Sequence, residues 1–222
     1  MQLLLTSAGI TTERLHGALR SMLRAPIDEC RALCIPTAGY ANRGGAQRAW
    51  NFISGNEPET PMCELGWAEV GVLELTALPS IDPEVWEPMV AETDVILVNG
   101  GDPLYLVHWM LRSGFAPLIS ELERPVYVGL SAGSMALTPR VGDDFVGWQP
   151  PGGGDAGLSL VDFSIFPHLD HEQLPENTMA DAERWAEALG TPAYALDDRS
   201  GLQIVDGEVT VISEGHWRQF PG

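Results

Sequence analysis

The chain has 222 residues, of which 45% are hydrophobic and 19% are charged, a balance typical of one globular domain spanning 1–222. Its 31 acidic and 12 basic residues give a formal net charge of −19. This charge argues against a nucleic-acid partner, because no basic surface is available to replace the counterions of phosphates. None of the bases is a lysine, which excludes lysine Schiff bases and the phosphate-binding lysine of a P-loop.

The cysteines and the apolar runs indicate the cellular compartment of the protein and whether it associates with a membrane. The chain has an odd number of cysteines, Cys30, Cys34 and Cys63, and its N-terminus does not resemble a signal peptide. We therefore expect core thiols in a reducing cytoplasm, with neither disulfides nor a thiolate metal site. No apolar run approaches the roughly 18 residues that cross a bilayer, so no membrane association is expected.

Short apolar runs alternate with helical patterns over the first 140 residues. Strands are predicted at 2–8, 31–38, 71–78, 94–101 and 125–130, and helices at 11–23, 46–54, 83–92 and 103–114. The runs are almost continuously hydrophobic, which is typical of a parallel sheet covered by helices on both faces. The pattern predicts a three-layer, doubly wound α/β fold with a mostly parallel sheet.

The last third of the chain has a different texture. Residues 141–157 are rich in loop formers, and the Gly- and Pro-rich segment 150–157 predicts either a lid or a disordered loop. A helix is predicted at 175–190, starting at a proline and ending at a glycine. Closing strands follow, with a hairpin at Asp206-Gly207, so we expect antiparallel C-terminal strands in the same domain.

The segment VYVGLSAGSMA (126–136) places a serine where a buried strand gives way to a helix-compatible segment. Gly129-Leu-Ser-Ala-Gly133 matches the G-x-S-x-G pattern in the strand-to-helix context of a nucleophile elbow. In such an elbow, a tight turn projects the serine oxygen beyond the sheet, and the flanking glycines avoid collisions with neighbouring backbone. Ser131 is therefore the candidate nucleophile, with a structural turn serine as the alternative.

A second loop, NGGDP (99–103), ends the preceding predicted strand. Paired glycines there allow backbone amides to approach a ligand closely. If the two strands are neighbours, the amides of Gly101 and Ala132 could bind one oxyanion. Asp102 in the same loop is a candidate substrate contact. The alternative is a Gly-Asp-Pro turn that caps the next helix, and the two interpretations are compatible.

A serine nucleophile needs a base, and five histidines are available. His16 and His108 lie in helical patterns and His216 lies near the C-terminal end, whereas His168 and His171 occupy a polar turn, FPHLDHEQ, after an apolar strand. Position alone leaves these two open between a catalytic role and a solvated loop. Asp197 and Asp198 follow the predicted strand AYAL and could orient the base.

Taken together, GLSAGSMAL, NGGDPLYL, IFPHLD and YALDDRSG resemble the peptidase E (aspartyl dipeptidase) family of serine peptidases, to which cyanophycinase is related. The resemblance runs in order through nearly the whole chain. It implies a flavodoxin-like or class I glutamine amidotransferase-like fold and hydrolysis of short peptides near their N-terminus.

Carried over by position, the resemblance implies Ser131 as nucleophile, His168 as base and Asp198 as the orienting acid. The family usually has glutamate at the third position, so Asp197 stays a possible substitute. The order Ser, His, acid differs from that of the α/β-hydrolases, where the acid precedes the histidine, and favours a peptidase over an esterase.

The family's aspartate specificity is implied less strongly. An arginine on the helix after the histidine turn binds the substrate's aspartate in aspartyl dipeptidases, and here that helix offers Glu183 and Arg184. If Glu183 faced the pocket it would repel an acidic side chain, and the enzyme would prefer another N-terminal residue.

The sequence therefore predicts a serine exopeptidase that acts on small peptides as a monomer or homodimer, without a metal or organic cofactor. One alternative is a cyanophycinase-like acyl hydrolase. Another is a homologue without catalytic activity that binds a small amide or amino acid in the pocket where the family binds its substrate.

Overall fold

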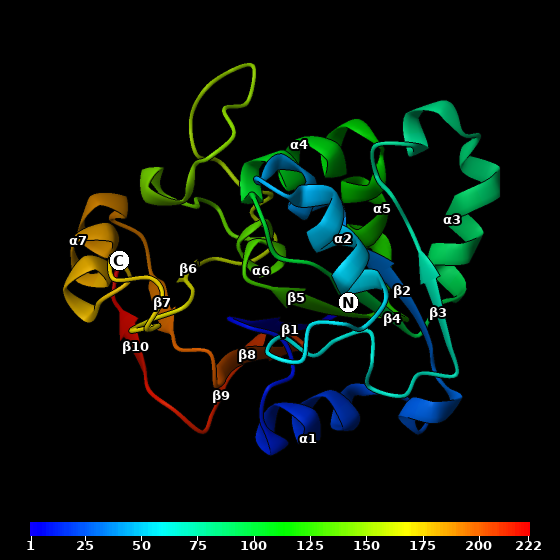
Figure 1. Ribbon diagram of the computed structural model, residues 1–222, viewed down its shortest axis with the longest axis horizontal. Coiled ribbons are helices and arrows are strands. Elements are labelled where there is room, and N and C mark those ends of the chain that lie inside the picture. Colours follow the sequence, from blue (N-terminus) through cyan, green and yellow to red (C-terminus); the bar gives the residue numbers. More distant parts are fainter.

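The computed structural model describes residues 1–222 and contains two β-sheets (Figure 1). The larger sheet has seven strands in the order β3-β2-β4-β5-β1-β8-β9, and the smaller sheet has the order β10-β7-β6. The larger sheet consists of β1 (Gln2–Thr6), β2 (Arg31–Ile35), β3 (Glu69–Val72), β4 (Val95–Val98), β5 (Val126–Leu130), β8 (Ser200–Val205) and β9 (Glu208–Ser213). The smaller sheet consists of β6 (Ser164–Phe166), β7 (Ala193–Leu196) and β10 (Trp217–Phe220).

The larger sheet confirms the predicted fold class. Strands β3, β2, β4, β5 and β1 are parallel to one another, whereas β8 is antiparallel to β1 and β9 is antiparallel to β8. The turn between β8 and β9 falls at Asp206-Gly207, where the sequence predicts a hairpin. All five parallel strands therefore end at one edge, where ligands bind in open α/β sheets.

Helices cover both faces of this sheet (Figure 1). On one face, Leu3 and Leu5 of β1 share a core with α3, α4 and α5, and on the other face Leu4 packs with Leu15 and Leu19 of α1. This alternation follows from the two-residue period of a strand. The helices are α1 (Glu13–Met22), α2 (Gly45–Ile53), α3 (Pro83–Glu92), α4 (Pro103–Arg112), α5 (Phe115–Glu121), α6 (Ala132–Met135) and α7 (Met179–Leu189). None of them has both the length and the apolarity needed to span a membrane.

Short 3₁₀ helices complete the chain at Ile27–Glu29, Thr37–Ala41, Leu78–Ser80 and Asp143–Phe145. The segment before the helix at Leu78–Ser80 differs from the sequence prediction. The strand expected at 71–78 ends at Val72, because the side chain of Glu74 accepts hydrogen bonds from Thr37 and Thr76 and turns the chain. Leu75 and Leu78 still reach the core, which explains the apolar run without a longer strand.

Two helix boundaries also differ. The segment 103–114 forms α4, and Gly114 in the left-handed region (φ 82°) then starts a separate helix, α5, which the sequence analysis does not predict. Helix α7 begins after Thr178 rather than at a proline, since Thr178 and Asp181 form a reciprocal capping box.

The smaller sheet is a feature that the sequence does not predict. Strand β6 pairs in parallel with β7, and β10 pairs antiparallel to β7. Phe166, Trp185 of α7 and Phe220 form its own core cluster. The segments of β7 and β10 were predicted as closing strands, but they pair with each other, and β7 also pairs with β6, the strand that His168 follows.

One buried hydroxyl links the core to the turn after β5. Tyr127 is fully buried and donates a 2.7 Å hydrogen bond to the carbonyl of Gly133, and burial raises the pKa of its phenol well above the ordinary value. Tyr127→Phe keeps the ring but leaves this carbonyl without its donor. We expect the free energy of unfolding to fall by about 1–3 kcal/mol in urea titrations.

The matched control is Tyr40→Phe, since Tyr40 is 43% exposed. It should leave the free energy of unfolding within about 0.5 kcal/mol of wild type. Equal effects of the two substitutions would contradict the assigned role of the Tyr127 hydroxyl.

Candidate active site

Ser131 occupies a strained turn between β5 and α6. Its backbone has φ 48° and ψ −108°, a conformation that non-glycine residues rarely adopt. The amide of Ser131 donates to the carbonyl of Thr6 at 3.0 Å, and its carbonyl accepts from Ser134 and Met135 at 2.9 Å each. Strain of this kind is typical of functional positions, and here hydrogen bonds from β1 and α6 hold it in place.

The two glycines of the motif are needed for close backbone approach. A Cβ on Gly129 would lie 2.7 Å from the carbonyl carbon of Gly133, and a Cβ on Gly133 would lie 2.4 Å from the carbonyl oxygen of Val98. Both distances are too short for real atoms, and the opposing atoms are backbone that cannot easily move. The spacing of glycines around Ser131 thus has a packing reason within this fold.

The Gly-Gly loop lies beside this turn. Strands β4 and β5 are neighbours, with Val98 opposite Gly129, and a Cβ built on Gly100 would lie 3.5 Å from the Cβ of Ser131. The Gly101 amide makes no backbone hydrogen bond. Ala132 is the first residue of α6, where an amide has no intrahelical partner. Two donor groups are therefore available on adjacent strand ends next to the serine.

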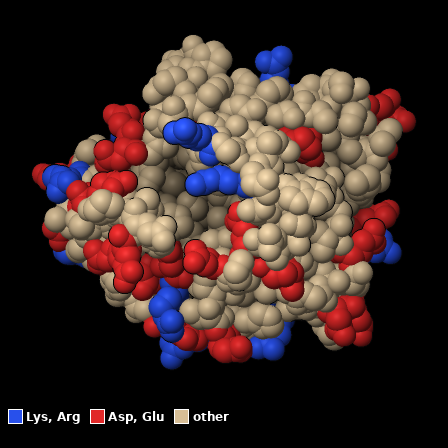
Figure 2. Space-filling model, in the orientation of Figure 1, with Lys and Arg blue, Asp and Glu red and all other residues tan.

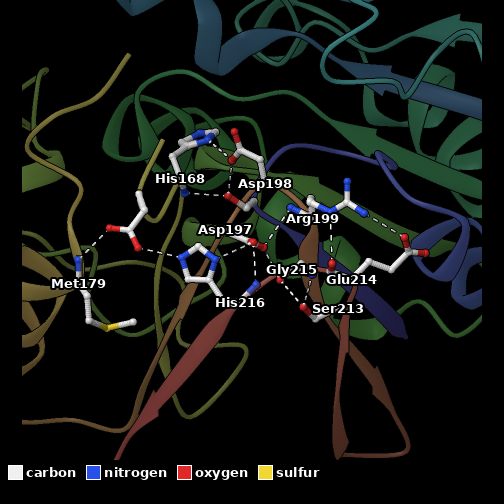
Figure 3. A network of polar contacts seen from close by, with 12 residues as sticks. His168, Met179, Asp197, Asp198, Arg199, Ser213, Glu214, Gly215 and His216 are labelled. Atoms are coloured by element: carbon white, nitrogen blue, oxygen red, sulfur yellow. Dashed lines mark hydrogen bonds and ion pairs between the residues drawn. The ribbon is translucent and has the colours of Figure 1, made fainter. Parts of the chain in front are cut away.

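His168 and Asp198 form a hydrogen-bonded pair (Figure 3). The distance from His168 Nδ1 to Asp198 Oδ1 is 2.7 Å, and the two side chains are only 21% and 29% exposed. When Nδ1 donates to the carboxylate, Nε2 is left as the acceptor on the other side of the ring. This is the tautomer that a general base beside a serine requires.

The electrostatics of Asp198 favour its charged form. Burial raises the pKa of this carboxyl, but the hydrogen bond and charge of His168 and the hydroxyl of Ser7 outweigh burial, and the net pKa lies below the ordinary value. Asp198 therefore carries its negative charge at neutral pH. A fixed anion at Nδ1 stabilises an imidazolium on the same ring.

Ser7 connects this pair to the larger sheet. It is a site residue that was not predicted from the sequence. Its hydroxyl donates to Asp198 Oδ1 at 2.9 Å and accepts from the backbone amide of His168 at 2.7 Å. His168 itself has a left-handed backbone, with φ 56°. The signal in the sequence was a polar Thr-Ser pair directly after the apolar run of β1, at the edge where parallel strands end.

The structure distinguishes Asp198 from Asp197. Asp197 is buried and accepts from Ser200 Oγ and from the amides of Arg199 and His216, so it organises the turn before β8. Figure 3 shows Asp198 facing His168 while Asp197 faces His216. The carboxylate in contact with His168 is thus that of Asp198.

The remaining histidines lie in other settings. His171 Nε2 is 3.4 Å from Asp198 Oδ2, so this ring also contacts the carboxylate, although it does not line the cavity described below. His216 Nε2 pairs with Asp170 at 2.8 Å. His16 and His108 lie within α1 and α4, as the helical patterns predicted.

Ser131 and His168 line the same cavity, which has a volume of about 750 Å³. Gly100 and Gly101 also line it, together with residues of α2 and of the loop after α2. Leu130 is the single hydrophobic residue of the lining, so the cavity suits a polar ligand. Figure 2 shows a hollow on this face, with basic side chains at one part of its rim and acidic side chains at another.

The three predicted substrate contacts are not part of the lining of this cavity. Arg184 pairs with Asp181 and donates to the carbonyl of Ala180, and Glu183 pairs with Arg218. Asp102 is buried; its carboxylate caps α4 at the Tyr105 amide and accepts from two amides of the 147–148 segment. The Gly-Asp-Pro segment therefore forms the helix-capping turn that was the alternative interpretation of its sequence.

The structure contains no cluster of three or more His, Cys, Asp or Glu side chains arranged to hold a metal ion.

The family model for peptidase family S51 matches residues 3–212. The chain belongs to peptidase family S51. This confirms the resemblance that the serine, Gly-Gly, histidine and acid segments indicate.

Two curated relatives show how far the similarity extends. An uncharacterized peptidase of Pasteurella multocida is 28% identical over 135 residues, covering 57% of this chain and 63% of the relative. Peptidase E of Shewanella baltica strain OS155 is 35% identical over 135 residues, covering 56% of each chain. These matches span between half and two thirds of the relatives' own lengths.

Solved structures show the same fold over almost the whole chain. A putative peptidase E from Listeria monocytogenes has a TM-score of 0.66 at 20% identity, covering 96% of this chain and 98% of that one. A peptidase from an acI-B1 actinobacterium also has a TM-score of 0.66, at 19% identity, with coverage of 99% and 93%.

The lowered pKa of Asp198 predicts a pH-dependent contribution to stability. A carboxyl whose pKa is lower in the folded state stabilises the fold above its unfolded pKa of about 3.9, and this stabilisation is lost as the pH falls through the folded value. Asp198→Asn should therefore lower the urea midpoint at pH 7, and the gap to wild type should shrink at pH 3.

Asp162→Asn is the matched control, since Asp162 is exposed and makes no ion pair. Its urea midpoint should follow wild type at both pH values. A gap for Asp198→Asn that is as large at pH 3 as at pH 7 would contradict the assigned stabilisation of the anion.

Proposed function

We propose that this protein is a serine exopeptidase that hydrolyses dipeptides or short peptides next to a free N-terminus. The observation that carries the proposal is the oriented His168–Asp198 pair, whose imidazole lines one cavity together with the strained Ser131. Membership of peptidase family S51 supports the same reaction class. The proposed triad is Ser131, His168 and Asp198, with aspartate where the family usually has glutamate.

In the proposed reaction, His168 Nε2 takes the proton of the Ser131 hydroxyl as its oxygen attacks the scissile carbonyl carbon. Asp198 holds the ring in the required tautomer and stabilises the imidazolium. The imidazolium then protonates the leaving amine, and the C–N bond breaks to give an acyl-enzyme. His168 then takes a proton from water, whose oxygen attacks the ester carbonyl. The bond to Ser131 Oγ breaks, the acid product leaves, and the imidazolium returns the proton to Ser131.

The amides of Gly101 and Ala132 are the proposed oxyanion donors. They come from the ends of the adjacent strands β4 and β5, on either side of the Ser131 turn. The Ser131 amide donates to Thr6, so it is not free for this purpose. Removal of one oxyanion donor typically costs about 10²–10³ in kcat, so these amides would contribute a large part of the rate enhancement.

The cavity favours a short substrate over the alternatives. Its volume of about 750 Å³ and its polar lining fit a peptide of a few residues rather than a long groove for a polymer, as a cyanophycinase-like activity would need. A catalytically silent binding homologue has no evident use for a strained serine facing the same cavity as an oriented imidazole. We further propose a cytoplasmic enzyme, because the three cysteines are free and buried thiols.

A preference for N-terminal aspartate is a separate question. The arginine that the resemblance assigns to the aspartate side chain, Arg184, is paired with Asp181 and does not line the cavity. The proposal therefore covers short peptides generally, with Asp-X substrates as one arm of the test.

The test is hydrolysis of a panel of X-Leu dipeptides together with labelling by a fluorophosphonate probe. Wild type should release leucine and react with the probe, and Ser131→Ala should do neither. Asp198→Asn should lower kcat by about 10⁴, because the imidazole loses its tautomer and its counter-charge.

Asp162→Asn is the matched control, because it removes a carboxylate that is exposed and makes no contact with His168 or Asp198. Its kcat should stay close to wild type. Failure of wild type to label, under conditions where a known serine peptidase labels, would favour the silent homologue. Labelling that persists in Ser131→Ala would show that the nucleophile lies elsewhere.

A further inference from the structure

Arg48 is a cation in the candidate active site that the proposed reaction does not use. It lies on α2, its side chain is exposed, and it lines the cavity that contains Ser131 and His168. No other arginine lines this cavity. Because the chain has no lysine, Arg48 is the one permanently charged base in the cavity lining.

Arg48 also lacks an anionic partner. Seven of the twelve arginines form ion pairs with carboxylates, namely Arg20, Arg31, Arg124, Arg140, Arg184, Arg199 and Arg218, whereas Arg48 forms none. A chain with 31 acidic residues has ample carboxylates to neutralise a surface arginine. An unpaired guanidinium inside the cavity is therefore available to an anion from outside.

The neighbours of Arg48 fit a carboxylate. Asn42, Asn51 and Asn56 line the same cavity, so side-chain amides accompany the guanidinium. A guanidinium binds a carboxylate through two parallel N–H···O hydrogen bonds, and amide groups supply further donors. We propose that Arg48 binds a carboxylate of the peptide substrate and thereby selects peptides that carry one within the cavity.

The inference rests on the proposed peptidase function and names the substrate class more closely. The carboxylate can come from the C-terminus of a dipeptide or from an acidic side chain. Glu57 and Glu59, on the loop after α2, also line the cavity and provide negative charge for an ammonium group. A short peptide with both termini free carries these two opposite charges within a few bond lengths of the scissile bond, whereas an internal segment of a protein does not.

The test measures binding to Ser131→Ala by calorimetry, so that turnover does not interfere. The probes are Ala-Leu and Ala-Leu-amide, which differ in the C-terminal charge, and Asp-Leu-amide and Asn-Leu-amide, which differ in the side-chain charge. Adding Arg48→Gln should weaken binding of a carboxylate-bearing probe about 10- to 100-fold. The substitution should leave the affinity for the uncharged probe of the same pair unchanged. Unchanged affinity also shows that the cavity remains folded.

Loss confined to the Ala-Leu pair identifies a C-terminal carboxylate, and loss confined to the Asp-Leu-amide pair identifies the side chain. Arg43→Gln is the matched control, because Arg43 is an exposed neighbour outside the cavity lining. It should leave the affinities for both pairs of probes unchanged. In the active enzyme, Arg48→Gln should lower kcat/KM for the same charged substrate mainly through KM.

The inference is overturned if Arg48→Gln weakens charged and uncharged probes equally, if it weakens none of them, or if Ser131→Ala binds none of the four. These outcomes differ from a failure of the proposed function, in which wild type neither hydrolyses the peptides nor reacts with the fluorophosphonate.

Discussion

The contacts of one carboxylate join the two sheets of this molecule at the cavity. Asp198 lies between β7 of the smaller sheet and β8 of the larger sheet. It contacts His168, which follows β6, and accepts from Ser7, which follows β1. Because Ser7 also accepts from the His168 amide, ring and backbone of the histidine are both fixed relative to the larger sheet. In the proposed reaction, the imidazole of His168 can act on Ser131 only if this junction holds, since β5 and β6 belong to different sheets.

Much of this arrangement could be predicted from local sequence. Continuous apolar runs predicted the parallel strands, and the glycines around Ser131 predicted a turn that backbone contacts at Gly129 and Gly133 now explain. The neighbouring strands β4 and β5 bring the Gly-Gly loop to the serine, as the motif required. These signals lie within a few residues of the feature they specify, and this is why one sequence suffices to find them.

Features that depend on distant pairing could not be predicted in this way. The smaller sheet exists because β6, β7 and β10 pair with one another, and nothing in their composition distinguishes this from closing the main sheet. Ser7 and Arg48 reach the site from β1 and α2, far in sequence from the motif. The sequence left the choice between Asp197 and Asp198 open, because adjacent residues leave a strand end in opposite directions. Only the folded structure shows that Asp198 is the one that contacts His168.

The central claim is that Ser131 forms a covalent acyl intermediate with the help of His168. The most direct measurement is mass spectrometry of the enzyme after rapid acid quenching during turnover of an amino-acid p-nitroanilide. The account predicts an added aminoacyl mass on the peptide that contains Ser131, and loss of this adduct in His168→Gln. Turnover with no covalent adduct, or an adduct on a different residue, would contradict it.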